Sequence, residues 1–253
     1  MSPELTGRVA LVTGAGQGIG AAVAAAVYRA GAHVGLLDQA ATVETAAHEL
    51  DERAPQDDGR ALALRADVAA SDQLSAAVDR LAQIWHEPDI LVNNAARTAT
   101  GSVWDVDLDD WDEVMATNLR SQLVATRRCA PAMREGGWGR IVNLTSLAGQ
   151  QGGLVAGPHY AASKAGVLTL TKVFAGELAS HGVTVNAVAP AAIQTPVMAE
   201  FPQERINAVA AALPVGRLGT PTEVADLVCY LCGASAGFIT GATFDINGGA
   251  HMR

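Results

Sequence analysis

Short apolar runs rich in β-branched residues alternate along this chain with longer, alanine-rich amphipathic stretches. This alternation limits the fold more than any other feature, because strands that are connected through helices pair in parallel. The runs are mostly apolar at consecutive positions, as expected for strands that helices cover on both faces. We therefore predict an α/β fold with one doubly wound, seven-stranded, mostly parallel sheet and helices on both faces.

The expected elements can be placed along the chain. Strands are expected at residues 8–13, 33–37, 60–65, 90–93, 140–144, 183–189 and 243–246. Helices are expected near residues 19–30, 40–53, 71–86, 109–134, 159–180 and 222–232. We find no linker, low-complexity segment or internal repeat, so a single domain over residues 1–253 is expected. Residues 190–221 break the alternation with several prolines, which is typical of a functional lid or a mobile segment.

Composition narrows the class of protein. The 253 residues are 49% apolar and 17% charged, which indicates a packed globular chain rather than a disordered one. The net charge of −9 and the lack of a dense Lys/Arg tract argue against nucleic acid or an anionic membrane as partner. We see no signal peptide, and the alanine-rich run at residues 21–27 is too short to span a bilayer. A soluble, cytoplasmic protein is expected.

Three cysteines occur, and two of them form a Cys-x-x-Cys pair: Cys229 and Cys232, with Cys129 far away. Such a pair can serve redox chemistry or bind a metal. The apolar neighbours favour a buried helix instead, and no second ligand pair accompanies it. We therefore expect no metal site, and the odd cysteine count points to a reducing compartment.

A glycine-rich turn follows the first expected strand and opens the first expected helix. Gly14, Gly18 and Gly20 lie within residues 13–20, Thr-Gly-Ala-Gly-Gln-Gly-Ile-Gly. Glycines let backbone N–H groups approach a pyrophosphate, and a helix N-terminus favours the anion. The usual Gly-x-Gly-x-x-Gly spacing fails because Ile19 occupies its last position. The flanking strand and helix favour a dinucleotide site over a turn without a ligand.

Asp38 ends the second expected strand, eighteen residues beyond Gly20. A carboxylate at this place can accept hydrogen bonds from ribose hydroxyls, and it would repel a 2′-phosphate. No Arg or Lys occurs in residues 14–20 or 38–43 to attract such a phosphate. We predict NAD(H) rather than NADP(H); a solvated surface aspartate is the alternative.

Tyr160 and Lys164 stand four residues apart, and Ser146 precedes the tyrosine by fourteen residues. Residues four apart on a helix share a face, so the ammonium is expected beside the phenol. A phenol has an ordinary pKa of about 10, and a nearby cation lowers that pKa by favouring the phenolate. With a serine hydroxyl in reach, the pair predicts proton transfer to or from an alcohol or a carbonyl. An exposed helix face is the alternative for the pair alone.

In combination, these segments resemble the short-chain dehydrogenase/reductase family over almost the whole chain, from Gly7 to about Gly249. The likeness rests on the turn at residues 13–20, Asp67-Val68, Asn93-Asn94-Ala95-Ala96, the tetrad Asn118, Ser146, Tyr160 and Lys164, the element Pro190, Ile193 and Thr195, the segment at residues 214–225, and Asn247-Gly248-Gly249. It implies a Rossmann fold that binds a nicotinamide dinucleotide. The cofactor residues that it implies are Gly14, Gln17, Gly18, Ile19, Gly20, Asp38, Asp67, Val68, Asn94, Ala95, Tyr160, Lys164, Pro190, Ile193 and Thr195.

The resemblance also implies a role for each tetrad member. Tyr160 would be the general acid or base, and Ser146 would hold the reacting oxygen near it. Lys164 would stabilise the phenolate and bind the nicotinamide ribose. Asn118 would hold a water in a proton relay behind the lysine, with a local bend of its helix. Two family glycines are replaced in this chain, by Ala96 and Ala191, and each replacement adds a methyl group beside the expected cofactor.

The substrate positions that the resemblance implies are mostly apolar: Leu147, Ala148, Val155, His159 and Ala192. They favour a small or medium secondary alcohol or ketone with a hydrophobic flank, oxidised or reduced with NAD(H). His159 could instead pack against the helix start.

Two other functions stay open. One is that of a 3-oxoacyl-carrier-protein reductase that uses NADPH. Such enzymes present basic residues to their acidic partner, at positions that correspond to Gly137 and His181 in this chain. The other is a nucleotide-sensing module without chemistry, against which the complete tetrad argues. Apolar residues on more than one face of the helices expected near 109–134 and 159–180 favour self-association, and relatives usually form homotetramers.

Overall fold

A computed structural model describes residues 4–52, 60–153, 156–199 and 201–252. Its seven strands form one sheet in the order β3-β2-β1-β4-β5-β6-β7, and every pairing is parallel. The strands are β1 (Val9–Thr13), β2 (His33–Asp38), β3 (Ala61–Arg65), β4 (Ile90–Asn93), β5 (Gly139–Leu144), β6 (Val183–Pro190) and β7 (Thr243–Ile246). All seven expected strands are confirmed, with ends that differ by a residue at most.

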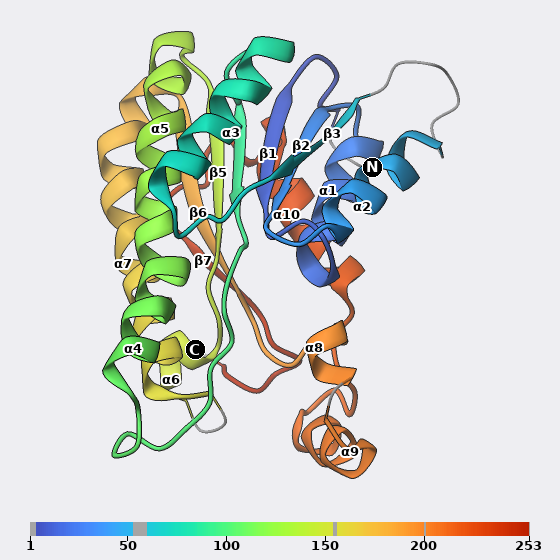
Figure 1. The fold of residues 1–253 in the computed structure, drawn as a ribbon, viewed down its shortest axis with the longest axis vertical. Helices are drawn as coiled ribbons and strands as arrows, with labels where there is room; N and C mark the ends of the chain where they lie inside the picture. Colours follow the sequence, from blue (N-terminus) through green and yellow to red (C-terminus); the bar gives the residue numbers. More distant parts are fainter. Residues whose placement is uncertain (1–3, 53–59, 154–155, 200, 253) are drawn as a thin grey trace.

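Helices cover both faces of the sheet, as predicted (Figure 1). They are α1 (Gly18–Arg29), α2 (Thr42–Glu52), α3 (Ser71–Ile84), α4 (Leu108–Met115), α5 (Ser121–Gly136), α6 (Ala148–Gln151), α7 (Pro158–Leu178), α8 (Pro196–Ala199), α9 (Gln203–Ala212) and α10 (Pro221–Cys232). Three short helices complete the set: a π-helix at Ala116–Arg120 and 3₁₀-helices at Ala179–His181 and Ala234–Ala236. One face carries α1, α2 and α10, and the other carries α3, α5 and α7 (Figure 1).

Neighbouring strand residues point to opposite cores, which explains the lack of alternation in the sequence. Leu36 belongs to the core under α1 and α10, whereas Leu37 belongs to the core under α3 and α5. Both side chains are fully buried. A strand covered on two faces needs apolar residues at every position, so the pattern that predicted the parallel sheet has a direct packing cause.

The helices α6, α8 and α9 and the π-helix between α4 and α5 were not predicted from the residue pattern. The single helix expected at 109–134 is divided by the π-helix Ala116–Arg120 into α4 and α5. Residues 190–221 contain α8 and α9, and α6 follows β5. The two ends of this segment are joined, because Ile193 and Gly219 form a parallel bridge. Gly219 N donates to Ala192 O over 3.1 Å, and Gln194 N donates to Gly219 O over 2.8 Å.

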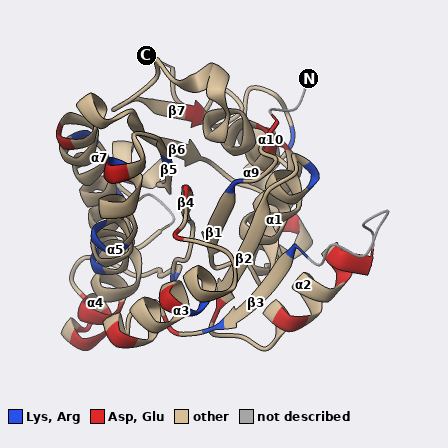
Figure 2. Cartoon of the chain, turned by 90° about the horizontal axis from the view of Figure 1, so that it is seen from above, with Lys and Arg blue, Asp and Glu red and all other residues tan. Residues whose placement is uncertain are grey.

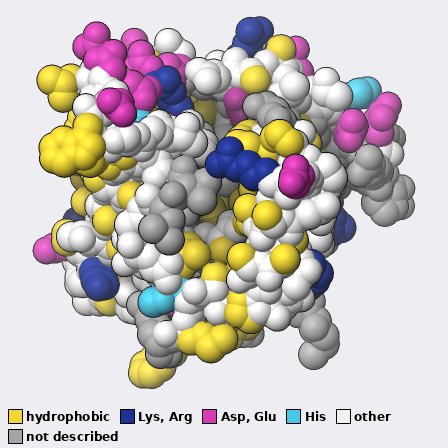
Figure 3. Space-filling model, turned by 90° about the horizontal axis from the view of Figure 1, so that it is seen from below, with side chains coloured by type: hydrophobic (Ala, Val, Ile, Leu, Met, Phe, Trp, Pro, Cys, Tyr) yellow, Lys and Arg dark blue, Asp and Glu magenta, His cyan; other side chains and the backbone are white. Residues whose placement is uncertain are grey.

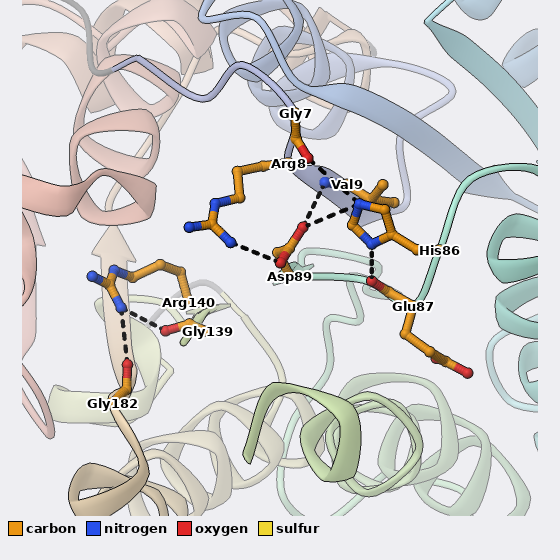
Figure 4. A network of polar contacts seen from close by, with 9 residues as sticks. All are labelled: Gly7, Arg8, Val9, His86, Glu87, Asp89, Gly139, Arg140 and Gly182. Atoms are coloured by element: carbon orange, nitrogen blue, oxygen red, sulfur yellow. Dashed lines mark hydrogen bonds and ion pairs between the residues drawn. The ribbon is translucent and has the colours of Figure 1, made fainter. Parts of the chain in front are cut away.

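The amino edge of the sheet is closed by polar contacts (Figure 4). Arg140 is only 3% exposed, and its guanidinium donates to Gly233 O, Gly139 O and Gly182 O over 2.7–3.3 Å. Asp89 accepts from Arg8 Nη1 at 3.0 Å and from Val9 N at 2.9 Å. The guanidinium groups of Arg8 and Arg140 both lie against the Trp138 ring, 3.7 and 4.5 Å from its centroid. Figure 2 looks onto this edge.

The cysteines are structural. Cys129, Cys229 and Cys232 are all free and buried, and the latter two face the core in α10. Burial raises the pKa of the Cys229 thiol to about 11, so a reactive thiolate is disfavoured. Among the described residues, no group of three or more His, Cys, Asp and Glu could hold a metal ion. In the same part of the chain, no helix is long and apolar enough to cross a membrane.

Candidate active site

A cleft of about 1280 Å³ opens at the carboxyl edge of the sheet. Its lining comes from the segments that follow β1, β2, β3, β4, β5 and β6, so one hollow collects residues from along the whole chain. Figure 3 shows this face, hollowed near its centre and walled largely by hydrophobic side chains. Ligands of doubly wound folds bind at this edge of the sheet. The volume exceeds the roughly 300–1,000 Å³ of ordinary ligand pockets, so it has room for a dinucleotide and a substrate.

The glycine-rich turn forms one end of the cleft. Gly14 has a φ of +65°, and a Cβ there would lie 2.7 Å from the Cα of Ala95. A Cβ on Gly20 would lie 2.0 Å from Gly14 O, so both positions require glycine. Asn94 Nδ2 locks the turn by donating to Thr13 O and Gly14 O over 2.9 and 3.0 Å. Gln17, the N-cap of α1, makes no side-chain cap, which leaves the first N–H groups of α1 available to an anion.

Asp38 lies beside this turn, as its place at the end of β2 predicts. One carboxylate oxygen accepts from Gly16 N at 3.0 Å, and the other accepts from Ala40 N at 3.0 Å. Asp38 lines the cleft together with Gln39 and Ala40, both uncharged. Arg65 is the register partner of Asp38 in the sheet, and Arg65 Nε donates to Gln39 O over 3.3 Å.

The cleft gathers nearly all of the predicted cofactor residues. Those that line it are Gly14, Gln17, Gly18, Ile19, Asp38, Asp67, Val68, Asn94, Ala95, Tyr160, Lys164, Pro190, Ile193 and Thr195. Gly20 does not line it, because it faces the inside of the turn. Ala96 and Ala191 line it too, and neither has a positive φ, so the alanines replace glycine without backbone strain.

Ser146, Tyr160 and Lys164 lie together on the cleft wall. Tyr160 and Lys164 are one turn apart on α7, and the lysine Nζ is 5.8 Å from the centroid of the phenol ring. Lys164 is 2% exposed, and its ammonium donates to Leu144 O over 2.8 Å. The predicted grouping is thus present, and the helix brings it about.

The electrostatics of this group differ from the prediction. Burial raises the pKa of Tyr160, and hydrogen bonding with Ser146 opposes this by a smaller amount. Burial also lowers the pKa of Lys164 to about 8. The expectation of a lowered Tyr160 pKa was wrong for the protein alone, because desolvation of the phenolate is the larger effect and only the hydrogen bond with Ser146 opposes it. The phenol is therefore held protonated, as a proton donor requires.

Asn118 lies behind this group rather than in the cleft. It is fully buried in the π-helix, which is the local bend that the resemblance implied. Its Oδ1 accepts from Arg97 N at 2.7 Å, and its Nδ2 donates to Arg97 O and Ser163 Oγ over 3.0 and 3.1 Å. Both the oxygen and the nitrogen of the side-chain amide thus bond protein groups.

Among the described residues, only one of the predicted substrate positions lines the cleft. Ala192 lines it, and Val155 lies outside the described residues. Leu147 and Ala148 do not line it, because they begin α6 and Leu147 N is tied to Pro190 O at 2.9 Å. His159 does not line it either: the side chain is fully buried and bonds Asp110. Its prediction as a substrate contact was wrong, and packing at the helix start is the correct alternative.

Several lining residues had no signal in the sequence. Met198, in α8, and Phe201 line the cleft and belong to the segment that follows β6. Thr117 and Arg120 come from the π-helix, and Arg120 Nη2 donates to Ala69 O over 3.0 Å. For Met198 and Phe201, the only indication in the sequence is that residues 190–221 interrupt the alternation of strands and helices. Thr117 and Arg120 depend on a bend that no residue type marks.

Comparison with known proteins agrees with this geometry. Residues 14–251 match a family model described as Enoyl-(Acyl carrier protein) reductase. The chain is 38% identical to a 3-oxoacyl-[acyl-carrier-protein] reductase of Pseudomonas aeruginosa, over 98% of this chain and 99% of the relative. It is 37% identical to a (3R)-3-hydroxyacyl-CoA dehydrogenase of Canis lupus familiaris, over 98% of each chain.

A solved structure extends the likeness to three dimensions. The crystal structure of a 3-oxoacyl-[acyl-carrier protein] reductase from Brucella melitensis superposes with a TM-score of 0.93 at 35% identity. The match covers 100% of this chain and 94% of that one. The protein belongs to the short-chain dehydrogenase/reductase family and is an oxidoreductase that acts on hydroxyl or keto groups.

Proposed function

We propose that the protein transfers a hydride between NAD(H) and a secondary alcohol/ketone pair, as a single-domain enzyme. The observation that carries the choice of cofactor is the Asp38 carboxylate, which lies at the glycine-rich turn and lines the cleft. The cleft residues next to it in sequence, Gln39 and Ala40, carry no charge. A carboxylate at this place suits the free ribose hydroxyls of NAD(H) and repels the extra phosphate of NADP(H).

Three parts of the cleft support a dinucleotide as the cofactor. The turn at Gly14 and the uncapped start of α1 would hold the pyrophosphate. Asp67 and Val68 line the cleft after β3, where an adenine would lie. Lys164 would bind the nicotinamide ribose from the cleft wall. The bound nicotinamide supplies or accepts the hydride.

The protein's own contribution is proton transfer and orientation. In the direction of reduction, the protonated Tyr160 hydroxyl donates its proton to the substrate oxygen. Ser146 holds that oxygen by a hydrogen bond, and this bond strengthens as negative charge develops there. Lys164, charged below about pH 8, stabilises the phenolate left after the transfer. The raised pKa of Tyr160 favours this direction, because the phenol begins in its donor form.

A substrate screen with two cofactors tests the proposal. NADH and NADPH are compared at equal concentration, with a panel of ketones in one direction and secondary alcohols in the other, over several pH values. We expect turnover with NADH to exceed turnover with NADPH by at least about 10-fold. Tight NADH binding without turnover of any panel member would instead support a nucleotide-sensing module.

A second candidate is the reduction of 3-oxoacyl thioesters. It is favoured by the 38% identity to a 3-oxoacyl-[acyl-carrier-protein] reductase and the 37% identity to a (3R)-3-hydroxyacyl-CoA dehydrogenase. Docking of an acidic carrier protein is disfavoured by the net charge of −9. Gly137, at one expected docking position, caps α5 in a left-handed conformation and carries no charge. A 3-oxoacyl-CoA and a 3-oxoacyl carrier protein therefore belong in the screen, and strong preference for the carrier protein with NADPH would establish this candidate.

We also propose that the chain forms a homotetramer. Val173 on α7 is 53% exposed, and Phe238 just before β7 is fully exposed, so large apolar side chains remain uncovered on two parts of the surface. Burial of such side chains between copies would stabilise the assembly. Sedimentation that gives the mass of one chain would contradict this proposal.

A further inference from the structure

Two series of polar contacts connect the start of α7 with Arg97. One starts at the backbone of Tyr160 and runs through buried residues of α7 and the π-helix. The other starts at His159, its neighbour in the chain, and runs through α4. The outer series contains no residue that we assign to the proton transfer, whereas the inner series includes Asn118 of the tetrad.

The inner series ties Tyr160 to the backbone of Arg97. Ser163 Oγ donates to Tyr160 O over 2.7 Å and accepts from Asn118 Nδ2 at 3.1 Å. The Asn118 amide then binds both sides of Arg97, with the backbone N–H at 2.7 Å and the carbonyl at 3.0 Å. Ser163 and Asn118 are fully buried, so these bonds form away from competing water.

The outer series ties His159 to the side chain of Arg97. His159 Nε2 lies 2.8 Å from Asp110 Oδ2, and Asp110 Oδ1 forms an ion pair with Arg97 Nη2 at 2.7 Å. This ion pair is a contact between charges and does not have the geometry of a hydrogen bond. Arg97 Nη1 also pairs with Glu113. Asp110 and Glu113 belong to the acidic helix α4, which stands out in Figure 2. Because α4 supplies both carboxylates, it holds the guanidinium next to α7.

Asp110 is the polar anchor of the His159 ring. The imidazole is fully buried, and its other nitrogen, Nδ1, has no hydrogen-bond partner in the described residues. Gly157 makes room for the ring, because a Cβ at that position would lie 2.4 Å from His159 Cε1. Loss of the Asp110 carboxylate would leave a buried imidazole with both nitrogens unpaired. The free-energy cost of such burial favours movement of the His159 ring.

We propose that these contacts form a closed ring that fixes Tyr160, and that His159 and Asp110 are positioning residues for it. The inference rests on the proposed role of Tyr160 as proton donor. The same ring fixes one wall of the cleft, because Arg97, Thr98 and Thr100 line it. Gly157 N donates to Ala99 O over 2.7 Å, which attaches this wall to the start of α7. Opening the ring would therefore displace the tyrosine and the wall together.

The test removes one side chain of the outer series at a time, either Asp110 or His159, in the full-length protein. In Asp110→Ala and His159→Leu, kcat is expected to fall about 10–100-fold, because small misplacements of a reacting group have effects of this size. The Kd for NADH, followed by its fluorescence, is expected to stay within about 3-fold. The double variant should lose no more than the worse single one, since both changes open the same ring.

Two matched variants separate positioning from general damage. His159→Gln keeps a side-chain N–H donor for Asp110 and is expected to retain at least about a third of the wild-type kcat. Asp112→Ala removes an exposed carboxylate from the same helix and should leave kcat unchanged. Additive losses in the double variant, or equal losses in His159→Gln and His159→Leu, would overturn the proposal.

A readout without turnover keeps this test apart from the proposed function. Hydrogen exchange of the segment 96–101 is expected to rise at least about 10-fold in Asp110→Ala, because its attachment to α4 and α7 is loosened. Unchanged exchange would overturn the closed ring, whatever the activity. If wild type turns over no substrate while exchange responds as expected, the proposed reaction fails and the ring stands.

Discussion

The two edges of the same sheet use their buried polar groups in opposite ways. At the amino edge, the Arg140 guanidinium donates to the carbonyls of Gly233, Gly139 and Gly182. At the carboxyl edge, Ser146 and Tyr160 line a cleft of about 1280 Å³. Stability and chemistry are thus assigned to different ends of the strands, and substitutions at the two ends should have separable effects.

The largest effect is expected from Tyr160→Phe at the carboxyl edge. Removal of the proton donor should lower kcat about 10³-fold, within the range known for general acid catalysis. NADH binding should change by less than about 3-fold, because the ring and Lys164 remain. Steady-state kinetics and a fluorescence titration measure the two quantities. Turnover near the wild-type level would remove Tyr160 from the reaction.

At the amino edge, Arg140→Met should have the reverse profile. Three carbonyls lose their donor, so the free energy of unfolding should fall by about 2–4 kcal/mol. Denaturant titration measures this, and kcat at low temperature should stay within about 3-fold of wild type. Arg134→Met, at an exposed position near the end of α5, serves as the control and should change neither quantity. A large drop in kcat for the folded Arg140 variant would erase the distinction between the edges.

Asp38→Asn sharpens the assignment of the cofactor. The amide keeps an oxygen acceptor for Gly16 N but loses the negative charge, so repulsion of a 2′-phosphate disappears. The ratio of kcat/KM for NADPH to that for NADH should rise about 10-fold. Asp72→Asn, on the exposed start of α3, should leave the ratio unchanged. An unaltered ratio in Asp38→Asn would mean that another group selects the cofactor.

The smallest effect is expected from Lys164→Met on stability. Burial lowers the pKa of Lys164 to about 8, so at pH 7 the folded state carries the cost of a desolvated charge. Its removal should raise the free energy of unfolding by about 1–2 kcal/mol, part of the gain being offset by loss of the bond to Leu144 O.

The pH dependence of that gain has a definite sign. Between about pH 8 and pH 10.5, the unfolded wild-type chain keeps the lysine proton that the folded protein has released. Wild-type stability therefore rises with pH through this window, and the advantage of Lys164→Met shrinks. Lys172→Met, exposed on the same helix, is the control. An advantage that grows above pH 8 would contradict desolvation of the ammonium as the cause of the gain.

The parts of the molecule that could be predicted from the sequence are those that follow a local residue pattern. Every strand was predicted, because residues such as Leu36 and Leu37 must both be apolar between two helical layers. The glycine-rich turn and Asp38 were placed correctly, since each follows a strand end. The single-domain organisation and the roles of the tetrad stay predictions.

Contacts between residues that are far apart in the chain could not be predicted from the sequence. Nothing in the residue order shows that His159 bonds Asp110, 49 positions earlier, rather than a substrate. The sign of the shift at Tyr160 was missed for the same reason, because burial depends on everything that packs around it. The π-helix at Ala116–Arg120 also has no residue type that marks it, so it was expected only from the resemblance.

The bridge between Ile193 and Gly219 has an evolutionary consequence. The bridge joins the two ends of the segment that contains α8 and α9. Because these ends are held together, a change in the length of the segment adds little loop-closure entropy and does not alter the sheet. The length and composition of this segment can therefore change while Ile193 and Gly219 stay paired and the reacting groups keep their positions. Diversification of substrate choice among relatives should concentrate in this segment.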